Sequence, residues 1–310
     1  MTPRSPKVTR VYQNHLLDST RWDGFTPRDD DIVVATPYKS GTTWMQLIVQ
    51  ALLTGGEPTA SIDEVSPWLD MRMSPIDEVI GKLEAQSHRR SIKTHLPLDG
   101  LRFFPELKYI VVSRDARDVF MSLWNHYSNY TPDFYERLNG KPGRVGNPLP
   151  VCPGDIREFW RGWITTGWFD WETEGFPFWS NMRHVQSWWD YRHLPNILFV
   201  HFNDLLSDLE GEILHVARFL DIEVPEEVLP RVVDSVTFST VKQNAESIWP
   251  GRENSFRGGA QTFFHKGTNS RWKTVLTESD LKLYEAAVAR ELSVECATWL
   301  EHGRGGSEAE

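Results

Sequence analysis

The sequence contains little cysteine and no long apolar run. Its 310 residues include two cysteines, Cys152 and Cys296, which supply neither a metal-binding spacing nor a disulfide framework. No stretch approaches the roughly 18 apolar residues that a membrane-spanning helix needs. Residues 1–10 also lack the apolar core of a secretory signal. These absences predict a cytoplasmic protein without a membrane partner.

The sequence also lacks an excess of basic residues. Its 33 Lys and Arg residues are outnumbered by 43 Asp and Glu residues, and the formal net charge is -10 at pH 7. Proteins that bind nucleic acids generally show a basic balance, so this composition argues against nucleic acid as a partner. Any anionic ligand must then be held by a local cluster of cations and backbone N–H groups.

Length and composition predict one domain. Hydrophobic residues make up 40% of the chain and charged residues 25%, which is ordinary for a globular protein with a core. No internal repeat and no linker rich in Pro, Gly or Ser divides the chain. We therefore predict a single domain over residues 1–310, with an N-terminal extension over about 1–25 and a frayed tail over 302–310.

Short apolar runs predict the strands of a parallel sheet. They are Ile32–Ala35, Tyr109–Val112, Ile197–Val200 and, more weakly, Ser91–Thr94. Helical patterns separate these runs, and this alternation is typical of an α/β fold, in which helices flank a central parallel sheet on both faces.

The clearest helix follows the first strand. Apolar residues recur at helical spacing from Trp44 to Leu52, and Gly55 ends the pattern. A second helix follows Val112, with Asp115 at its N-cap position. Two late helices are predicted over Leu205–Leu220 and Glu278–Leu300.

The segment between the first strand and its helix, Thr36–Trp44 (TPYKSGTTW), predicts a phosphate cradle. The N–H groups of a first helical turn have no partner within the helix, and the helix dipole favours an anion there. Gly41 allows close approach of the backbone, Thr42 and Thr43 add hydroxyl donors, and Lys39 adds a positive charge. The loop is P-loop-like but differs from the nucleotide-triphosphatase motif, in which Lys follows the last Gly. An ordinary α/β turn is the alternative interpretation.

Several stretches, in order, resemble the cytosolic PAPS-dependent sulfotransferase family. Its loop is close to TYPKSGTTW and binds the 5′-phosphosulfate of PAPS (3′-phosphoadenosine 5′-phosphosulfate); this chain has Pro37-Tyr38 in place of Tyr-Pro. The further matches are Lys93–Pro97 (KTHLP), Tyr109–Tyr127, Trp188-Trp189 with Asn196–Asp204, and Phe264–Trp272 (FHKGTNSRW), so that the resemblance covers roughly residues 30–275.

The resemblance implies an enzyme that moves a sulfuryl group from PAPS to a hydroxyl of a small organic acceptor, such as a phenol, an alcohol or a sterol. His95 would be the general base, since a histidine can accept a proton near neutral pH. Lys39 would face the oxygen that bridges sulfur and the 5′-phosphate, and Lys93 would contact the sulfuryl oxygens. The family requires no metal.

The resemblance also implies a set of donor-binding residues. The 5′-phosphosulfate, the adenine and the 3′-phosphate would be held by Lys39, Ser40, Gly41, Thr42, Thr43, Trp44, Arg114, Ser122, Phe202, Phe238, Phe264, His265, Lys266 and Gly267. Arg114 and Ser122 would bind the 3′-phosphate, and His265 stands where the family has Arg, which predicts weaker or pH-dependent binding. Without the resemblance, the aromatic residues are equally typical of core packing.

Four segments leave questions open. Seven of the fourteen tryptophans lie in Trp160–Trp189, where they would line an acceptor pocket or pack a helical layer, and we expect a mixture of the two. The segment Asn129–Pro150 predicts a loop at the pocket mouth, and the Gly-rich segment Ser247–Arg271 predicts disorder or a lid. The family's dimer motif is only partly matched in Lys273–Lys282, which leaves the oligomeric state open.

Two rival functions remain. A small-molecule kinase would need a Lys after the loop glycine and a carboxylate that holds magnesium, and the order of the loop residues speaks against it. A nucleotide-binding regulator without catalysis would have no need for His95, Lys39 and Lys93 together.

Overall fold

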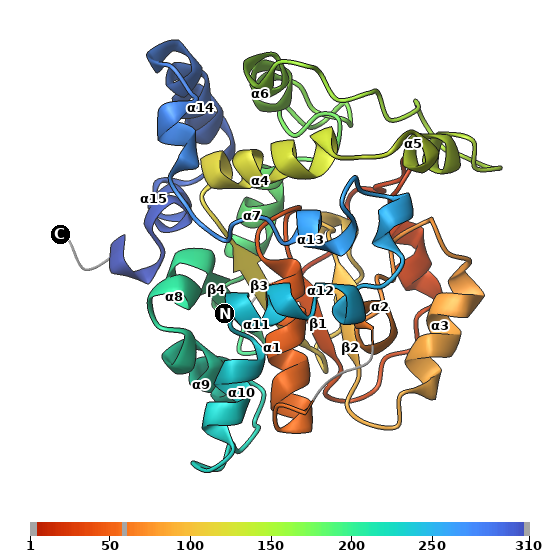
Figure 1. The fold of residues 1–310 in the computed structure, drawn as a ribbon, viewed down its shortest axis with the longest axis vertical. Helices are drawn as coiled ribbons and strands as arrows, with labels where there is room; N and C mark the ends of the chain where they lie inside the picture. Colours follow the sequence, from red (N-terminus) through yellow and green to blue (C-terminus); the bar gives the residue numbers. More distant parts are fainter. Residues whose placement is uncertain (1–4, 58–60, 307–310) are drawn as a thin grey trace.

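Four parallel strands form the centre of the computed structural model, which describes residues 5–57 and 61–306 (Figure 1). The strands are β1 (Ile32–Ala35), β2 (Ser91–Thr94), β3 (Lys108–Ser113) and β4 (Ile197–His201), and they lie in the order β2-β1-β3-β4. All four predicted strands are confirmed, including the weak one.

The register of the sheet aligns the strand ends. Ala35 of β1 pairs with Thr94 of β2 and with Val111 of β3. Because the strands are parallel, the segments that follow them emerge at one edge, where ligands bind in open α/β sheets. The predicted base His95 and the predicted phosphate ligand Arg114 directly follow β2 and β3 and therefore share this edge with the cradle.

The two helices that follow β1 and β3 begin and end where local sequence predicts. Helix α1 covers Thr42–Thr54 and ends at Gly55, whose φ of 63° lies in the left-handed region that glycine favours. Helix α4 covers Ala116–Ser128, and the Asp115 side chain caps it by accepting from the Arg117 N–H.

The remaining helices surround the sheet. They are α2 (Ile62–Val65), α3 (Ile76–Ala85), α5 (Pro132–Asn139), α6 (Ile156–Thr165), α7 (Asn181–Trp189), α8 (Phe202–Ser207), α9 (Leu209–Phe219), α10 (Leu229–Ser235), α11 (Phe238–Gln243), α12 (Ala245–Ile248), α13 (Gly259–Phe263), α14 (Glu278–Glu291) and α15 (Val294–His302). Short 3-10 turns lie at Ser19–Gly24, Leu98–Gly100, Arg252–Asn254, Arg271–Thr274 and Arg304–Gly306.

The predictions of two long late helices were wrong. Helix α8 ends before Asp208, whose carboxylate accepts from the Gly211 N–H and begins α9. Helix α14 ends before the extended Leu292, and Ser293 caps α15. In each case a capping side chain satisfies the N–H groups of a new helix, which competes with continuation of the old one.

Both faces of the sheet are covered, which confirms the α/β prediction. Val34 belongs to the core on the face that α1, α9 and α10 cover. Its neighbour Val33 belongs to the core on the other face, where Trp188 of α7 packs. Successive side chains of a strand point to opposite faces, so short apolar runs without alternation are typical of strands buried on both sides.

The N-terminal region contributes to the second of these cores. Tyr12 and Trp22 are completely buried there, so the described part of the predicted extension packs against the sheet. Residues 1–4 lie outside the described residues, as do residues 307–310 of the predicted frayed tail. Just before them, Arg304–Gly306 forms a 3-10 turn.

A buried ion pair lies at the sheet edge opposite the strand ends described above. Arg90 and Asp31 directly precede β2 and β1, and their side chains are 0% and 2% exposed. Arg90 Nε and Nη2 donate to the two Asp31 carboxylate oxygens over 2.8 and 2.5 Å. The pair therefore ties the starts of two adjacent strands together at a distance from the candidate site.

We predict that Asp31→Asn lowers the free energy of unfolding by up to about 3–5 kcal/mol, because it removes the buried carboxylate of the pair and leaves the Arg90 charge to its 2.8 Å contact with Glu84, which is 53% exposed. Urea unfolding followed by circular dichroism measures the loss. The matched control is Asp30→Asn, since Asp30 is 65% exposed and lies 3.7 Å from Arg89; its effect should stay below about 1 kcal/mol. Equal effects of the two variants would contradict the assignment.

Candidate functional site

A cavity of about 550 Å³ lies at the edge of the sheet where the strands end. Most of the residues predicted from the sequence line it: Lys39, Gly41, Thr42, Thr43, Trp44, Lys93, His95, Arg114, Ser122, Phe202, Phe238, Phe264, His265, Lys266 and Gly267. Ser40 is the exception, since it does not line the cavity and its completely buried hydroxyl has no hydrogen-bond partner among the described residues.

The cradle presents the N-terminus of α1 to this cavity. Gly41 is the N-cap with φ +107°, and no side chain caps the first turn. A Cβ at Gly41 would lie 2.9 Å from the Phe202 ring, so both the conformation and the close approach require glycine. The N–H groups of the first turn therefore remain available to an anion.

His95 is held in one orientation at the floor of the cavity. Its side chain is buried, and its Nδ1 lies 2.7 Å from the Thr36 carbonyl oxygen. A carbonyl only accepts, so Nδ1 carries the proton and Nε2 keeps a free lone pair. Burial first, and then the positive charge of Lys93, hold the pKa of His95 well below its usual range. The imidazole is thus neutral and can accept a proton.

Two lysines line the cavity, and neither forms an ion pair with a carboxylate in the described part of the chain. Lys39 Nζ is 3.9 Å from the centre of the Phe263 ring, and Lys93 Nζ is 4.2 Å from that of Trp68. Burial is the main cause that lowers the pKa of Lys39 to about 7 and that of Lys93 to about 8. An anion in the cavity would favour the charged form of both side chains and raise both pKa values.

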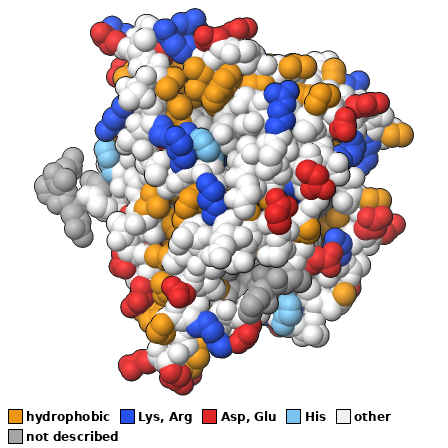
Figure 2. Space-filling model, in the orientation of Figure 1, with side chains coloured by type: hydrophobic (Ala, Val, Ile, Leu, Met, Phe, Trp, Pro, Cys, Tyr) orange, Lys and Arg blue, Asp and Glu red, His pale blue; other side chains and the backbone are white. Residues whose placement is uncertain are grey.

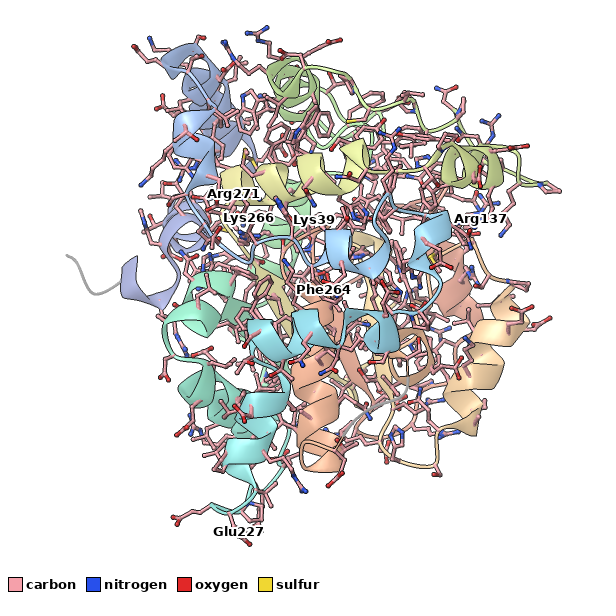
Figure 3. All side chains as sticks on the ribbon, viewed as in Figure 1. Lys39, Arg137, Glu227, Phe264, Lys266 and Arg271 are labelled. Atoms are coloured by element: carbon pink, nitrogen blue, oxygen red, sulfur yellow. The ribbon has the colours of Figure 1, made fainter. Side chains whose placement is uncertain are left out.

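Arg114 is held at one end of the cavity by the loop of residues 264–270, called the late loop from here on. Its Nε donates to Asn269 Oδ1 over 2.9 Å and its Nη2 to the Thr268 carbonyl over 2.9 Å. The sequence analysis did not identify Arg271, which lines the cavity with a buried Nε that has no partner among the described residues. Figure 3 shows Arg271 and Lys266 beside Lys39, and the three cations belong to the same cavity.

The cavity is cationic although the protein is anionic. Among the described residues, its lining has one carboxylate, Asp63, and seven basic side chains, namely Lys39, Lys93, Arg114, Arg137, Arg252, Lys266 and Arg271. On the face shown in Figure 2, Lys, Arg and His side chains gather beside the late loop. This is the local cation cluster that a net charge of -10 requires for binding a polyanion. Among the described residues, no group of three or more His, Cys, Asp or Glu side chains could hold a metal.

Aromatic rings stand next to the end of the cavity that contains Arg114. Trp44 and Phe202 contact edge to face with ring centres 5.4 Å apart, and Trp44 Nε1 donates to the Val236 carbonyl over 2.8 Å. Phe238 is 37% exposed and covers Gly267, where a Cβ would lie 2.8 Å from the ring. A partly exposed ring of this kind can stack on a planar ligand.

The opposite end of the cavity is largely apolar. It is lined by side chains that the sequence analysis did not identify, including Leu16, Trp68, Met71, Met73, Trp249 and Phe256. At its rim, Arg252 pairs with Asp63 and lies 4.0 Å from the centre of the Trp249 ring. Figure 3 shows Arg137 at the side of the cavity away from Arg271.

The structure decides between the alternatives for the Trp-rich segment. None of its seven tryptophans lines the cavity, and Trp160, Trp163 and Trp188 are completely or almost completely buried in the helical layers. Trp179 also packs behind the site, with its ring centre 5.7 Å from that of His95. The packing part of the expectation is therefore confirmed, and the part that placed these tryptophans in the cavity lining was wrong. The segment Asn129–Pro150 does reach the cavity through Tyr130, Phe134 and Arg137, although by helix α5 more than by a loop.

The predicted disorder or lid over Ser247–Arg271 resolves into short helical turns. Helix α13 and the turn Arg252–Asn254 belong to it, and its residues form one wall of the cavity. Lys242 Nζ donates to the His265 carbonyl over 2.9 Å and holds the late loop against α11. In the described part of the chain, no helix has the length and apolar character needed to cross a membrane.

Comparisons with known proteins agree on one family. A family model described as a sulfotransferase domain matches residues 29–294. The chain is 31% identical to a glycolipid sulfotransferase of Mycobacterium bovis, over 99% of this chain and 98% of that protein. It is 27% identical to sulfotransferase 1A1 of Rattus norvegicus, over 87% of each chain.

Solved structures with low sequence identity share the fold. Mouse sulfotransferase SULT7A1 in a complex with PAP (adenosine 3′,5′-bisphosphate, the product that PAPS leaves) has a TM-score of 0.66 at 21% identity. The match covers 93% of this chain and 92% of the mouse chain. Retinol dehydratase in a complex with retinol and PAP has a TM-score of 0.66 at 22% identity, over 89% of this chain and 84% of its own. The family model and the relative at 31% identity, each spanning most of the chain, show that it belongs to the sulfotransferase family.

Proposed function

We propose that the protein transfers a sulfuryl group from PAPS to a hydroxyl of a small organic or amphiphilic acceptor. The observation that carries this proposal is a single cavity that joins three features: a phosphate cradle, a neutral His95 with a free Nε2, and two buried lysines. The solved structures of similar fold are complexes with PAP, which supports the donor class.

The residues of the cavity fit this donor. The first turn of α1 and Lys39 would hold the 5′-phosphosulfate, which supplies the sulfuryl group. Arg114, Ser122 and Lys266 would hold the 3′-phosphate, and we add Arg271 because its guanidinium reaches the same end of the cavity with an unpartnered Nε. Trp44, Phe202 and Phe238 would contact the adenine.

The reaction assigns one role each to His95, Lys39 and Lys93. His95 Nε2 accepts the proton that the acceptor hydroxyl loses as its oxygen bonds to sulfur. The Lys39 ammonium stabilises the negative charge that grows on the oxygen of the breaking bond to sulfur, and Lys93 stabilises the sulfuryl oxygens. By analogy with phosphoryl transfer, catalysis is mainly positioning plus charge stabilisation.

The wall of the cavity indicates the kind of acceptor. Trp68 lies 4.7 Å from His95 between ring centres, and Met71 and Phe256 add apolar surface to the same cavity. This wall favours a phenol, a sterol-like alcohol or another hydroxyl on an apolar scaffold. The similarity to a glycolipid sulfotransferase adds glycolipids to these classes. The Arg252–Asp63 pair at the rim could bind the polar part of an amphiphile. The cytoplasmic location stays a prediction.

The geometry disfavours the rival functions. A kinase needs carboxylates that hold magnesium, and the one carboxylate that the described residues contribute to the cavity lining, Asp63, is paired with Arg252. A regulator without catalysis has no use for an imidazole whose free nitrogen faces the cavity beside two lysines.

We predict that adenosine 3′,5′-bisphosphate binds clearly more tightly than ADP in calorimetry without magnesium. Arg114→Ala should cost about 1.5–3 kcal/mol of binding free energy, since a charge-assisted hydrogen bond to the 3′-phosphate is lost. Arg192→Ala is the control, because Arg192 pairs with Glu295 outside the cavity. Binding no tighter than that of ADP would mean that no 3′-phosphate site exists and would end the proposal.

We predict that His95→Asn abolishes most turnover but leaves bisphosphate binding intact. The amide of Asn can still donate to the Thr36 carbonyl but cannot act as a base, so kcat should fall by about 10²–10⁴. Sulfuryl transfer to a phenol, a sterol and a glycolipid, followed as bisphosphate release, gives the rate. A variant that keeps wild-type turnover would remove His95 from the mechanism.

We predict that His265 makes 3′-phosphate binding pH-dependent. Burial and the nearby cations lower the pKa of His265, so it is neutral at alkaline pH and gains charge as the pH falls. A bound phosphate raises that pKa, so the affinity of wild type relative to His265→Gln should rise as the pH falls from about 8 to about 5.5. Calorimetry on both proteins separates this effect from the titration of the phosphate, which changes both affinities equally. A ratio of wild-type to His265→Gln affinity that stays constant over this pH range would contradict a role for His265.

A further inference from the structure

A chain of polar contacts connects Lys39 to the acceptor half of the cavity. Lys39 Nζ lies 3.3 Å from His126 Nδ1, and His126 Nε2 lies 2.8 Å from the Tyr38 hydroxyl. The Tyr38 hydroxyl in turn lies 3.4 Å from that of Tyr130. All four side chains line the cavity, yet the proposed reaction gives no role to His126 or Tyr38.

The chemistry of these groups determines which one donates and which one accepts in each hydrogen bond. An ammonium group only donates, so the charged Lys39 requires His126 Nδ1 to accept. The proton of the neutral imidazole is then on Nε2, which donates to the Tyr38 oxygen. Tyr38 keeps its own proton for Tyr130 or for a ligand in the cavity. The charged Lys39 therefore selects this tautomer of His126, and Tyr38 holds the ring by accepting from Nε2.

Packing fixes the His126 ring in this position. The residue is 3% exposed, and its ring centre lies 5.0 Å from that of Tyr130 and 4.7 Å from that of Phe256. Phe263 contacts both partners, at 5.5 Å from the His126 ring and 3.9 Å from the Lys39 ammonium. The aromatic cage leaves the imidazole little freedom to turn away.

Lys39 needs such a support. A lysine side chain carries about 2 kcal/mol of rotamer entropy, and its ammonium is a point charge on a flexible stem. Charge stabilisation is effective only where the charge is already placed when the bond breaks. If the Lys39 ammonium occupied several positions in the cavity, it would stabilise the transition state less.

We propose that His126, oriented by Tyr38, is a positioning residue that holds the Lys39 ammonium in place for sulfuryl transfer. The inference rests on the proposed function, because Lys39 acts there on the breaking bond. It adds to that function a second histidine, which touches neither of the reacting groups and acts through Lys39.

The groups around Lys39 and His126 set the pKa values of both side chains, and these determine the pH dependence that the proposal predicts. Burial, Lys93 and Arg114 lower the pKa of Lys39 to about 7, and burial with Lys39, Lys93 and His95 keeps His126 neutral by holding its pKa well below its usual range. Because the neutral His126 accepts a hydrogen bond from the Lys39 ammonium, it favours the charged form of Lys39 and raises its pKa. The titratable or charged groups that face the pair are Tyr38, Lys93, His95, Arg114, Tyr130 and, through Tyr38, Arg252.

The test compares four variants with wild type. His126→Phe removes both hydrogen bonds and keeps the planar ring of the cage. His126→Asn offers an amide oxygen near the position of Nδ1 and so keeps an acceptor for Lys39 alone. Tyr38→Phe removes the group that orients His126. His15→Phe is the matched control, since His15 is a buried histidine that does not line the cavity.

Turnover should separate positioning from folding. The assay uses whichever of the phenol, the sterol and the glycolipid is sulfated by wild type. His126→Phe should lower kcat about ten- to a hundredfold at unchanged acceptor KM, because a misplaced Lys39 charge stabilises the transition state less. His126→Asn should recover most of this loss, Tyr38→Phe should show a smaller loss, and His15→Phe should behave as wild type. Faster turnover of His126→Phe, or faster hydrolysis of PAPS without acceptor, would mean that His126 restrains Lys39 and would overturn the proposal.

A binding measurement keeps this inference distinct from the proposed function. The 5′-phosphate of adenosine 3′,5′-bisphosphate raises the pKa of Lys39 when it binds, so affinity should fall as the pH rises through about 7, the pKa of Lys39 in the free protein. In His126→Phe the fall should begin at lower pH, and in Lys39→Ala this part of the pH dependence should vanish. If the bisphosphate does not bind, the proposed function fails; if it binds with the same pH dependence in wild type and His126→Phe, the positioning role alone fails.

Discussion

The hydrogen bond between His95 Nδ1 and the Thr36 carbonyl is the contact on which the site depends. It spans 2.7 Å between the segments that follow β1 and β2, and it exists because Ala35 and Thr94 are paired in the sheet. The same bond orients the imidazole and fixes its tautomer. A shift in register between these strands would separate the base from the cradle, so the pairing of two strands of four residues each controls the proton chemistry.

The cavity stores electrostatic free energy in the absence of a ligand. Burial of Lys39, Lys93 and Arg114 lowers all three pKa values, which means that the fold disfavours their charged forms. A polyanionic donor reverses this by supplying the missing counter-charge, so part of the binding free energy comes from relieving the desolvated cations. The protein as a whole carries a net charge of -10, so attraction of an anion to this cavity depends on the local convergence of the backbone N–H groups and the basic side chains.

Local sequence predicted the strands, the cradle and α1 because each depends on neighbours in the chain, such as the Gly41 and Gly55 positions at the two ends of that helix. It could not predict Trp68 or Arg252, since they reach the cavity only through tertiary packing and no motif contains them. The long late helices were wrong because capping by Asp208 competes with apolar periodicity. Ser40 belongs to the motif, yet its side chain is buried outside the cavity.

The inverted dipeptide Pro37-Tyr38 and the histidine at position 126 belong together. A loop with proline in place of Tyr38 would have no hydroxyl to accept the proton of His126 Nε2, and the imidazole would then be buried with one polar nitrogen unsatisfied. Conversely, without His126 the Tyr38 hydroxyl would lose its 2.8 Å partner inside an aromatic cage. The departure from the TYPKSGTTW pattern therefore places a hydroxyl beside the buried His126. It links the cation at the phosphate cradle to the wall that receives the acceptor, so the cradle and the acceptor end of this cavity are coupled through Lys39.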